Sequence, residues 1–321
     1  MKHILESQQF SREYLDAFFL RAEKLARLFA NPATEDDLHN TLSRKSMCEF
    51  FSEPSTRTFF SFSMVGHRLG MFVASSENAD QSSSLYKGES LKDTTRIIAG
   101  YGFDVMVMRN KLNGASKIAA AVCDQYGLRT RIVNAGDGTE QHPTQALLDL
   151  FTIWMNLKER LYDRITVAIG GDLLRGRTVR SLAYLLERFN ARIIFVSPRE
   201  LAIPVGIKEY LTKHGIEFRE ETSVAAAIPE ADVVYWTRTQ NERNDGGIDL
   251  SGVNFSDYVI DTPQVRMFKP GAILMHPMPI AGEITEAAKD DPHCVCFDQA
   301  WNGLPVRAEL LLELFGQENS F

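Results

Sequence analysis

The amino-acid sequence predicts an α/β protein with two doubly wound parallel-sheet domains joined by long helices. Its 321 residues are enough for two domains of about 150 residues each. Short apolar, β-rich runs alternate with stretches of helical period, as in proteins whose parallel strands are linked by crossover helices. A long helical pattern at Pro143–Leu157 separates two such series. We therefore expect domains at residues 1–150 and 151–299, with a C-terminal helix in residues 300–321 that packs back on the first domain.

The first series alternates strands and helices up to the long helical pattern. The expected strands are Met47–Phe51, Met71–Ser75, Val105–Met108 and Arg131–Asn134. The helical patterns between them are Thr56–Leu69, Leu91–Tyr101 and Ala115–Tyr126. In doubly wound sheets the carboxyl ends of the strands line the ligand site, so the turns that follow these strands are the first places to search for function.

The second series follows the same alternation. Its expected strands are Ile165–Gly170, Arg192–Val196, Val233–Thr237 and Ala272–Met275. Its expected helices are Arg177–Phe189 and Ile207–His214, and the C-terminal helix is expected at about Leu304–Phe315.

The charge balance disfavours a polyanion-binding protein. Lys and Arg total 35 against 42 Asp and Glu, which gives a formal net charge of −7. Nucleic acids and acidic membranes normally require a basic face, so we expect neither as a partner. The N-terminal segment lacks the apolar core of a signal peptide, and no apolar run reaches membrane-spanning length. We therefore expect a cytoplasmic protein.

The cysteines predict no metal centre. Cys48, Cys123, Cys294 and Cys296 include no C-x-x-C pair and no His/Cys spacing typical of zinc. We expect reduced or buried thiols and no metal.

The first motif that carries chemistry lies after the strand that ends at Phe51. The segment Ser52–Thr58 contains a proline turn and leads into a helix, so Ser55–Thr58 would place backbone N–H groups at a helix N-terminus. Hydroxyl groups from Ser55, Thr56 and Thr58 can add hydrogen bonds, and the Arg57 guanidinium can bind a phosphate in a bidentate manner. A simple Ser or Thr helix cap is the alternative interpretation.

A second motif begins the long helical pattern. Pro143 suits the first turn of a helix, so His142 and Gln145 project from the same end. An imidazole there can donate to a carbonyl oxygen, and a glutamine amide can recognise an amide nitrogen. The alternative is a histidine that only caps or packs the helix.

A third motif, Gly170–Thr178, is one residue short of a phosphate-binding P-loop. Gly171, Gly176 and Thr178 fit the pattern, but Arg177 replaces its lysine. A nucleotide hydrolase therefore remains a rival reading. It is disfavoured because the strand Val233–Thr237 is followed by an arginine and not by a magnesium-binding aspartate.

Two later turns point to the same edge of the second sheet. Arg238 and Gln240 follow one strand, and the sequence His-Pro-Met-Pro at 276–279 follows another. Together with Arg177 these side chains could converge on a ligand rich in carboxylates. Each could instead be a solvated surface group.

Taken together, the segments resemble the carbamoyltransferase family, and more closely its aspartate branch. The resemblance extends from about Phe50 to Arg307. Ser-Thr-Arg-Thr at 55–58 and His-Pro-Thr-Gln at 142–145 match the family's two signatures. Lys87, with Ser83 four residues earlier, resembles the family's mobile loop, and the sequence at 276–279 is similar to the aspartate branch's His-Pro-Leu-Pro.

The resemblance implies carbamoyl phosphate and L-aspartate as substrates, with no cofactor. The residues it implies for catalysis are Arg57, Thr58, Lys87, Arg109 and His142. The residues it implies for substrate binding are Ser55, Thr56, Ser83, Gln145, Arg177, Arg238, Gln240, Met278 and Pro279. In particular, Gln145 and the backbone at Met278 would read the carbamoyl amide. By analogy with the family, Ser83 and Lys87 would come from a neighbouring subunit, so we expect a homotrimer with shared active sites and leave room for regulatory or pathway-partner chains.

The sequence departs from the family's commonest pattern at several positions. Phe59 replaces a second arginine and Met278 replaces leucine, whereas Ile280, Gly282 and Asp298 stand where Arg, Asp and Arg are expected. The proposed contact residues are intact, but we expect the salt bridges that stabilise domain closure in relatives to differ here. Two alternatives stay open: a carbamoyltransferase for another amino acid, and a catalytically silent homologue that serves as an assembly partner.

Overall fold

The computed structural model describes residues 1–31, 38–77, 88–240 and 247–320. The chain forms two compact units, one of Met1–Leu147 with Asn302–Phe321 and one of Leu148–Trp301. Helix α6, Pro143–Leu157, contains the point at which the chain passes from the first unit into the second. No helix in the described part of the chain is both long and apolar enough to cross a membrane.

The first unit contains a four-stranded parallel sheet in the order β2-β1-β3-β4. The strands are β1 Ser46–Phe51, β2 Phe72–Glu77, β3 Val105–Asn110 and β4 Arg131–Asp137. The central strands β1 and β3 are apolar and buried along almost their whole length, because helices cover both faces of the sheet.

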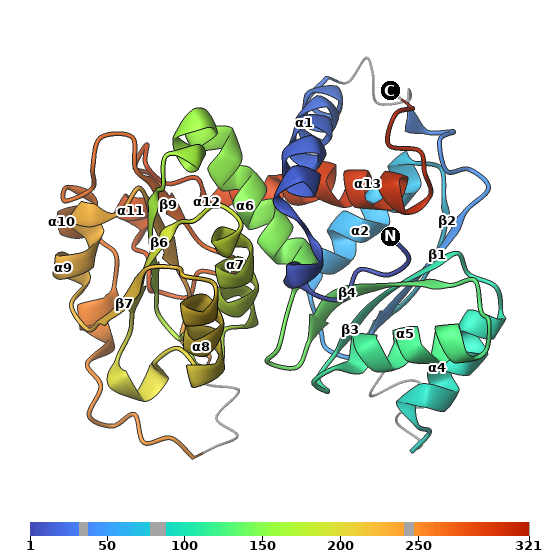
Figure 1. Ribbon diagram of the computed structural model, residues 1–321, viewed down its shortest axis with the longest axis horizontal. Coiled ribbons are helices and arrows are strands. Elements are labelled where there is room, and N and C mark those ends of the chain that lie inside the picture. The colour runs from blue at the N-terminus through green and yellow to red at the C-terminus, as the bar shows by residue number, and fades with distance from the viewer. Residues whose placement is uncertain (32–37, 78–87, 241–246, 321) are drawn as a thin grey trace. The chain divides into compact units, whose positions relative to one another are not determined.

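The helices of this unit form two layers around its sheet (Figure 1). One layer consists of α1 Arg12–Phe29, α2 Thr56–Arg68 and the C-terminal helix α13 Gly303–Leu314, which contacts both α1 and α2. The other consists of α4 Leu91–Gly100 and α5 Ala115–Gln125. The 3-10 helix Ser7–Gln9 precedes α1.

The second unit contains a five-stranded parallel sheet in the order β7-β6-β5-β8-β9. Its strands are β5 Thr166–Gly170, β6 Arg192–Val196, β7 Phe218–Glu221, β8 Val233–Trp236 and β9 Ile273–Met275. The edge strand β7 was not predicted, because its Phe-Arg-Glu-Glu sequence is mostly polar.

Helices also lie on both sides of this second sheet (Figure 1). Helices α7 Arg177–Glu187 and α8 Val205–Lys213 contact each other on one side. On the other side, residues of the short helices α9 Val224–Ala227, α10 Thr262–Val265 and α11 Glu286–Lys289 join sheet residues such as Ile194 and Val234 in one apolar cluster. Helix α12, Cys296–Trp301, contacts β9. The two parallel sheets with interleaved helices confirm the predicted fold class.

Candidate active site

The turn between β1 and α2 presents the first turn of a helix at the carboxyl edge of the first sheet. Ser55 occupies the N-cap position of α2, but its side chain makes no capping hydrogen bond. Thr56 and Arg57 are exposed on the first helical turn, and Thr58 is buried. Because the first N–H groups of a helix have no partner within the helix, this turn is suited to an anion. The simple-cap interpretation is not supported, since the Ser55 hydroxyl does not cap.

Arg109 lies near the end of β3, beside the turn that follows β1. Its Nη2 donates to Glu53 Oε1 at 2.9 Å, and its Nη1 is 3.4 Å from the Ala135 carbonyl oxygen. The Arg109 and Glu53 side chains are only 12% and 17% exposed. The Ser52 N–H donates to the Arg109 carbonyl oxygen at 2.9 Å, which ties the turn to β3. A fixed, partly desolvated guanidinium therefore stands beside the helix N-terminus.

His142 is buried next to Thr58. Its Nε2 lies 3.4 Å from Thr58 Oγ1, and its Nδ1 lies 3.4 Å from Thr144 Oγ1. The residue before it, Gln141, is anchored by the Ser7 N–H, which donates to Gln141 Oε1 at 2.8 Å. The structure thus places Thr58 and His142, 84 positions apart in the chain, side by side. Gln145 is half-buried on the first turn of α6.

In the second unit, Asp172 joins two neighbouring strand ends. This buried carboxylate accepts from the Gln240 N–H at 3.0 Å and from the Arg175 N–H at 3.1 Å. Gly171 has φ +104°, and a Cβ there would lie 2.0 Å from the Thr237 carbonyl oxygen, so the two strand ends can approach this closely only with glycine. The turn that resembles a P-loop is therefore held by Asp172.

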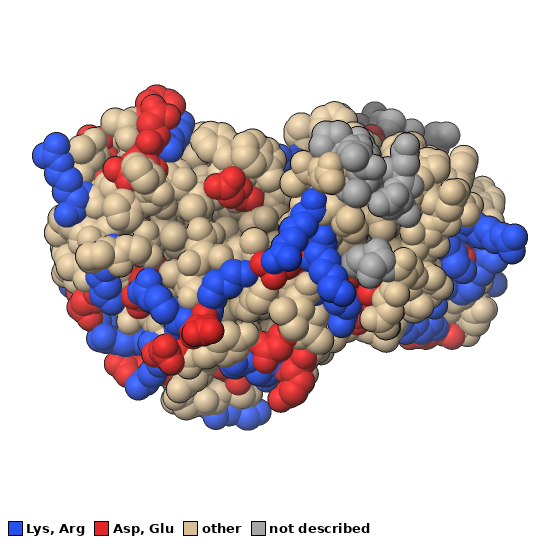
Figure 2. Space-filling view, turned by 90° about the horizontal axis from the view of Figure 1, so that it is seen from above, with Lys and Arg blue, Asp and Glu red and all other residues tan. Residues whose placement is uncertain are grey.

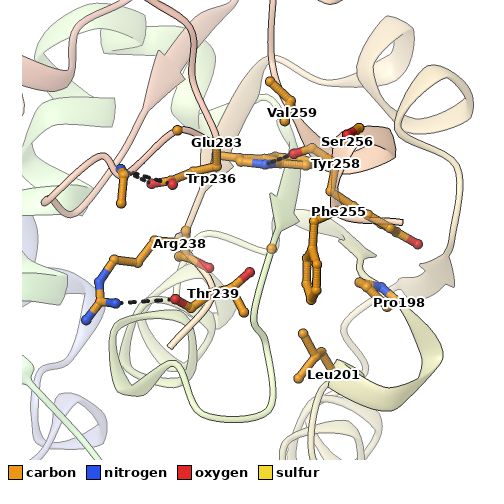
Figure 3. A pocket seen from close by; sticks show the side chains of 14 residues that line it. Pro198, Leu201, Trp236, Arg238, Thr239, Phe255, Ser256, Tyr258, Val259 and Glu283 are labelled. Atoms are coloured by element: carbon orange, nitrogen blue, oxygen red, sulfur yellow. Dashed lines mark hydrogen bonds between the residues drawn. The ribbon is translucent and has the colours of Figure 1, made fainter. Parts of the chain in front are cut away.

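Arg238 lines a cavity of about 540 Å³ at the carboxyl ends of β5 and β8. Figure 3 shows Arg238 and Thr239 across from Phe255, with Nη1 of Arg238 3.3 Å from the Thr239 carbonyl oxygen. Apolar residues, including Pro198, Leu201 and Trp236, make up much of the wall. Arg177 is buried at the start of α7, and neither it nor Gln240 is among the described residues that line this cavity.

Glu283 belongs to the same wall and is held by protein partners. Its Oε1 lies 2.6 Å from His276 Nε2, and both carboxylate oxygens accept from the Ala281 N–H. Burial opposes its ionisation, but His276 together with backbone N–H groups, including that of Ala281, outweighs burial and keeps the Glu283 pKa below its ordinary value. The cavity thus contains a carboxylate that is already paired.

The His-Pro-Met-Pro segment follows β9. Met278 has φ +59°, the Met278–Pro279 peptide bond is cis, and the Met278 N–H donates to His276 Nδ1 at 2.8 Å. Met278 is half-buried and Pro279 is exposed.

The departures from the family pattern have structural counterparts. The Phe59 ring packs edge-on against Phe51, with ring centroids 5.5 Å apart. Ile280 packs on the apolar cluster of the second unit, and Gly282 forms part of the cavity wall. Asp298 is exposed on α12. At Phe59 and Ile280, apolar packing thus takes the place of a charged side chain.

Several polar residues near these sites were missed by the sequence analysis. They are Glu53, Asp149, Asp172, Tyr235, Glu283 and Gln299. One signal was available: Asp149 is a single charge in the apolar run Leu147–Phe151, and a buried carboxylate needs hydrogen-bond donors. Ser83 and Lys87 lie outside the described residues. Within the described ranges, no cluster of three or more His, Cys, Asp or Glu side chains could hold a metal ion.

The visible surface is of mixed charge. Basic and acidic side chains lie close to one another over much of the face drawn in Figure 2. This arrangement agrees with the net charge of −7 and gives that face no broad basic area.

Comparison with known proteins identifies both halves of the chain. Residues 2–155 match the sequence profile described as aspartate/ornithine carbamoyltransferase, carbamoyl-P binding domain. Residues 163–314 match the one described as aspartate/ornithine carbamoyltransferase, Asp/Orn binding domain.

Individual relatives cover nearly the whole chain. A chloroplastic aspartate carbamoyltransferase of Arabidopsis thaliana is 41% identical over 97% of this chain and 77% of its own length. An aspartate carbamoyltransferase catalytic subunit of Haloquadratum walsbyi is 40% identical over 98% of each chain. A crystal structure of Trypanosoma cruzi aspartate transcarbamoylase, in complex with carbamoyl phosphate and aspartate, has a TM-score of 0.87 and 35% identity over 97% of this chain and 95% of its own. On these grounds the chain belongs to the aspartate/ornithine carbamoyltransferase family.

Proposed function

We propose that the protein transfers the carbamoyl group of carbamoyl phosphate to the amino group of L-aspartate, giving N-carbamoyl-L-aspartate and phosphate for pyrimidine biosynthesis. One observation carries the proposal. The carboxyl edge of the first sheet combines a helix N-terminus with Arg109, Thr58 and His142, which are the groups that a phosphorylated carbonyl compound requires. The relatives that match nearly the whole chain are named aspartate carbamoyltransferase or aspartate transcarbamoylase, which supports this choice of reaction.

The chemistry assigned to the first unit follows from charge. Attack of the aspartate amine on the carbonyl carbon builds negative charge on the carbonyl oxygen, which Arg109, His142 and Thr58 would stabilise. The first turn of α2, with Ser55, Thr56 and Arg57, would hold the phosphate. The departing phosphate can accept the amine proton, and holding both substrates together removes the entropic cost of their encounter.

The acceptor assignment rests on the second unit. Arg177, Arg238 and Gln240 suit the two carboxylates of aspartate, whereas a diamino acid would need an acidic partner. Glu283 is the one carboxylate among the described residues that line the cavity, and it is engaged by His276 and the Ala281 N–H. An engaged carboxylate is a poor partner for an ornithine ammonium group.

A bisubstrate compound tests this function. A structure of the T. cruzi enzyme contains N-(phosphonacetyl)-L-aspartic acid, which unites a phosphonate with the aspartate skeleton. We expect this compound to compete with carbamoyl phosphate and to stabilise our protein against heat, because one molecule fills both substrate positions. Absence of both effects would contradict the proposed function. If the compound binds but no transfer occurs, the protein is a silent homologue.

We propose further that the protein is a homotrimer in which Ser83 and Lys87 of one subunit complete the active site of the next. The support is the family resemblance of the segment around these residues. Two inactive variants, Lys87→Ala and His142→Ala, should recover activity when mixed and reassembled, because some hybrid sites receive a normal lysine and a normal histidine. Verified mixed trimers without activity would place Lys87 in the site of its own subunit.

A further inference from the structure

A buried chain of hydrogen bonds in the second unit ends on the backbone of Met278. Asp149 on α6 accepts from the Tyr235 hydroxyl at 2.8 Å and from the Gln299 side-chain amide at 2.6 Å. The side-chain oxygen Oε1 of Gln299 in turn accepts from the His276 backbone N–H at 2.8 Å. Tyr235, Asp149 and Gln299 are 0% exposed and His276 is 1% exposed. When one partner of such a buried hydrogen bond is removed, the other is left unsatisfied. Each of these four residues therefore depends on the others for its hydrogen bonds.

The direction of each bond in this chain follows from which of the groups can donate. The Asp149 carboxylate only accepts, and burial together with Asp149 raises the Tyr235 pKa well above its ordinary value, so Tyr235 donates. The Gln299 nitrogen faces Asp149, which leaves its oxygen for His276.

The imidazole itself has one consistent arrangement. Because the Met278 N–H donates to Nδ1 at 2.8 Å, Nδ1 carries no proton. The hydrogen of the neutral ring is therefore on Nε2, which lies 2.6 Å from Glu283 Oε1.

The Met278 backbone needs such support. Its φ of +59° lies in the left-handed region, which is unfavourable for a residue with a Cβ. Pro277 and Pro279 have no N–H, so the Met278 N–H is the single backbone donor in this three-residue segment. With that N–H bonded to Nδ1, recognition of a ligand amide, which requires an acceptor, falls to the carbonyl oxygens of the segment.

We propose that His276 is a positioning residue for carbamoyl transfer. Its Nδ1 holds the Met278 backbone so that residues 277–279 present carbonyl oxygens to the carbamoyl amide, and its Nε2 ties the segment to Glu283 on the cavity wall. This inference rests on the proposed function and on the family resemblance, which implies that the Met278 backbone reads the carbamoyl amide.

Two substitutions separate the two ring nitrogens. In His276→Asn, the side-chain oxygen takes the place of Nδ1 and can still accept from the Met278 N–H. In His276→Gln, the amide reaches the place of Nε2 and can bond Glu283, but the acceptor for Met278 is lost. We expect His276→Gln to lower kcat/KM for carbamoyl phosphate by about 10²-fold, as a misplaced substrate contact does, and His276→Asn to stay within about tenfold of the unaltered protein. His293→Asn, at a half-buried histidine paired with Asp291, is the matched control and should change little.

A spectroscopic measurement on the unaltered protein gives an independent answer. In protein labelled with ¹⁵N-histidine, His276 should show a protonated Nε2 and an unprotonated, hydrogen-bonded Nδ1. This measurement requires neither activity nor a folded variant. The inference can therefore be tested even if His276→Gln does not fold.

The outcomes are distinct. Equal impairment of His276→Asn and His276→Gln at equal thermal stability, full activity of His276→Gln, or a proton on Nδ1 would each overturn the positioning role. Absence of carbamoyl transfer by the unaltered protein would instead refute the proposed function.

Discussion

Arg109 Nη2 donates to Glu53 Oε1 at 2.9 Å, so the guanidinium assigned to the donor substrate is paired with a carboxylate of its own unit. Glu53 neutralises Arg109 and competes with an incoming anion for it. We expect Glu53→Gln to lower the thermal midpoint of the ligand-free protein by about 2–4 °C. The stabilisation by inorganic phosphate should increase at the same time, because the competing charge is gone. Thermal unfolding with and without phosphate measures both, and a smaller phosphate effect in the variant would contradict this relationship.

Arg57 tests the phosphate position. It is exposed on the first turn of α2, so Arg57→Ala should leave folding stability almost unchanged. We expect turnover to fall by roughly 10²–10³-fold, the loss of about 2–4 kcal/mol that accompanies removal of one preorganised charged contact. Arg27→Ala, at a 75% exposed side chain on α1, is the control. Near-normal kinetics of Arg57→Ala would contradict the assignment of the phosphate site to the first turn of α2.

Arg238 tests the acceptor position. Because it lines the cavity of the second unit, Arg238→Ala should raise KM for aspartate strongly, by about 10²-fold for a lost carboxylate contact, and leave KM for carbamoyl phosphate nearly constant. Initial rates with each substrate varied in turn provide the measurement. Equal weakening of both substrates would show that Arg238 is structural.

Glu309 predicts a pH-dependent stability. Its fully buried carboxyl on α13 is paired with Arg21 on α1, and burial outweighs that pairing and raises the Glu309 pKa to about 7. The folded protein therefore keeps a proton that the unfolded chain loses near pH 4.3, so this contribution is full below pH ~4.3 and is lost as pH rises through about 7. It amounts to about 4 kcal/mol at most.

A Glu309→Gln variant stays neutral at every pH. In denaturant unfolding between pH 5 and 8, the free energy of unfolding of this variant should thus decline less steeply with pH than that of the unaltered protein. Glu286→Gln, at an exposed glutamate on α11, should keep the original slope. Identical slopes in all three proteins would exclude Glu309 as the titrating group.

Cysteine reactivity should differ by site. The neighbouring Cys296 lowers the pKa of half-buried Cys294 to about 7, whereas burial raises the pKa of Cys48 to about 12 and that of Cys123 above its ordinary value. We expect iodoacetamide to label Cys294 first, with a rate that rises to half its maximum near pH 7. Mass spectrometry of the peptides measures this. Cys296→Ala should move the midpoint upward, and an unchanged midpoint would exclude Cys296 as the cause of the lowered pKa.

The interior strands were predicted accurately because each is an apolar run. β1, β3, β5 and β6 lie inside their sheets, and each lies within one or two residues of its expected range, because a strand covered on both faces has few polar positions. β7 was missed because its Phe-Arg-Glu-Glu sequence is mostly polar, whereas the edge strands β2, β4 and β9 were predicted. Helix α1 was also not predicted, although Leu15, Phe18, Ala22 and Leu25 recur at helical spacing.

The candidate site was only partly accessible from sequence. Local patterns located Thr58 and His142, since each lies at the start of a helix, whereas Arg109 came from the family resemblance. The pairs that hold these groups join distant parts of the chain. Glu53 and Arg109 are 56 positions apart, and Asp149 and Tyr235 are 86 positions apart. No local periodicity encodes such pairs, so the polar chain behind Met278 emerged only from the structure.

The central claim is the choice of acceptor, and initial rates of carbamoyl transfer from carbamoyl phosphate test it most directly when L-aspartate and L-ornithine are offered side by side. Arg177, Arg238 and the engaged Glu283 predict that N-carbamoyl-L-aspartate is formed. The kcat/KM for aspartate should exceed that for ornithine by at least about 10³-fold, as expected for a site built to bind carboxylates. A higher kcat/KM for ornithine, or no transfer to aspartate, would contradict the account.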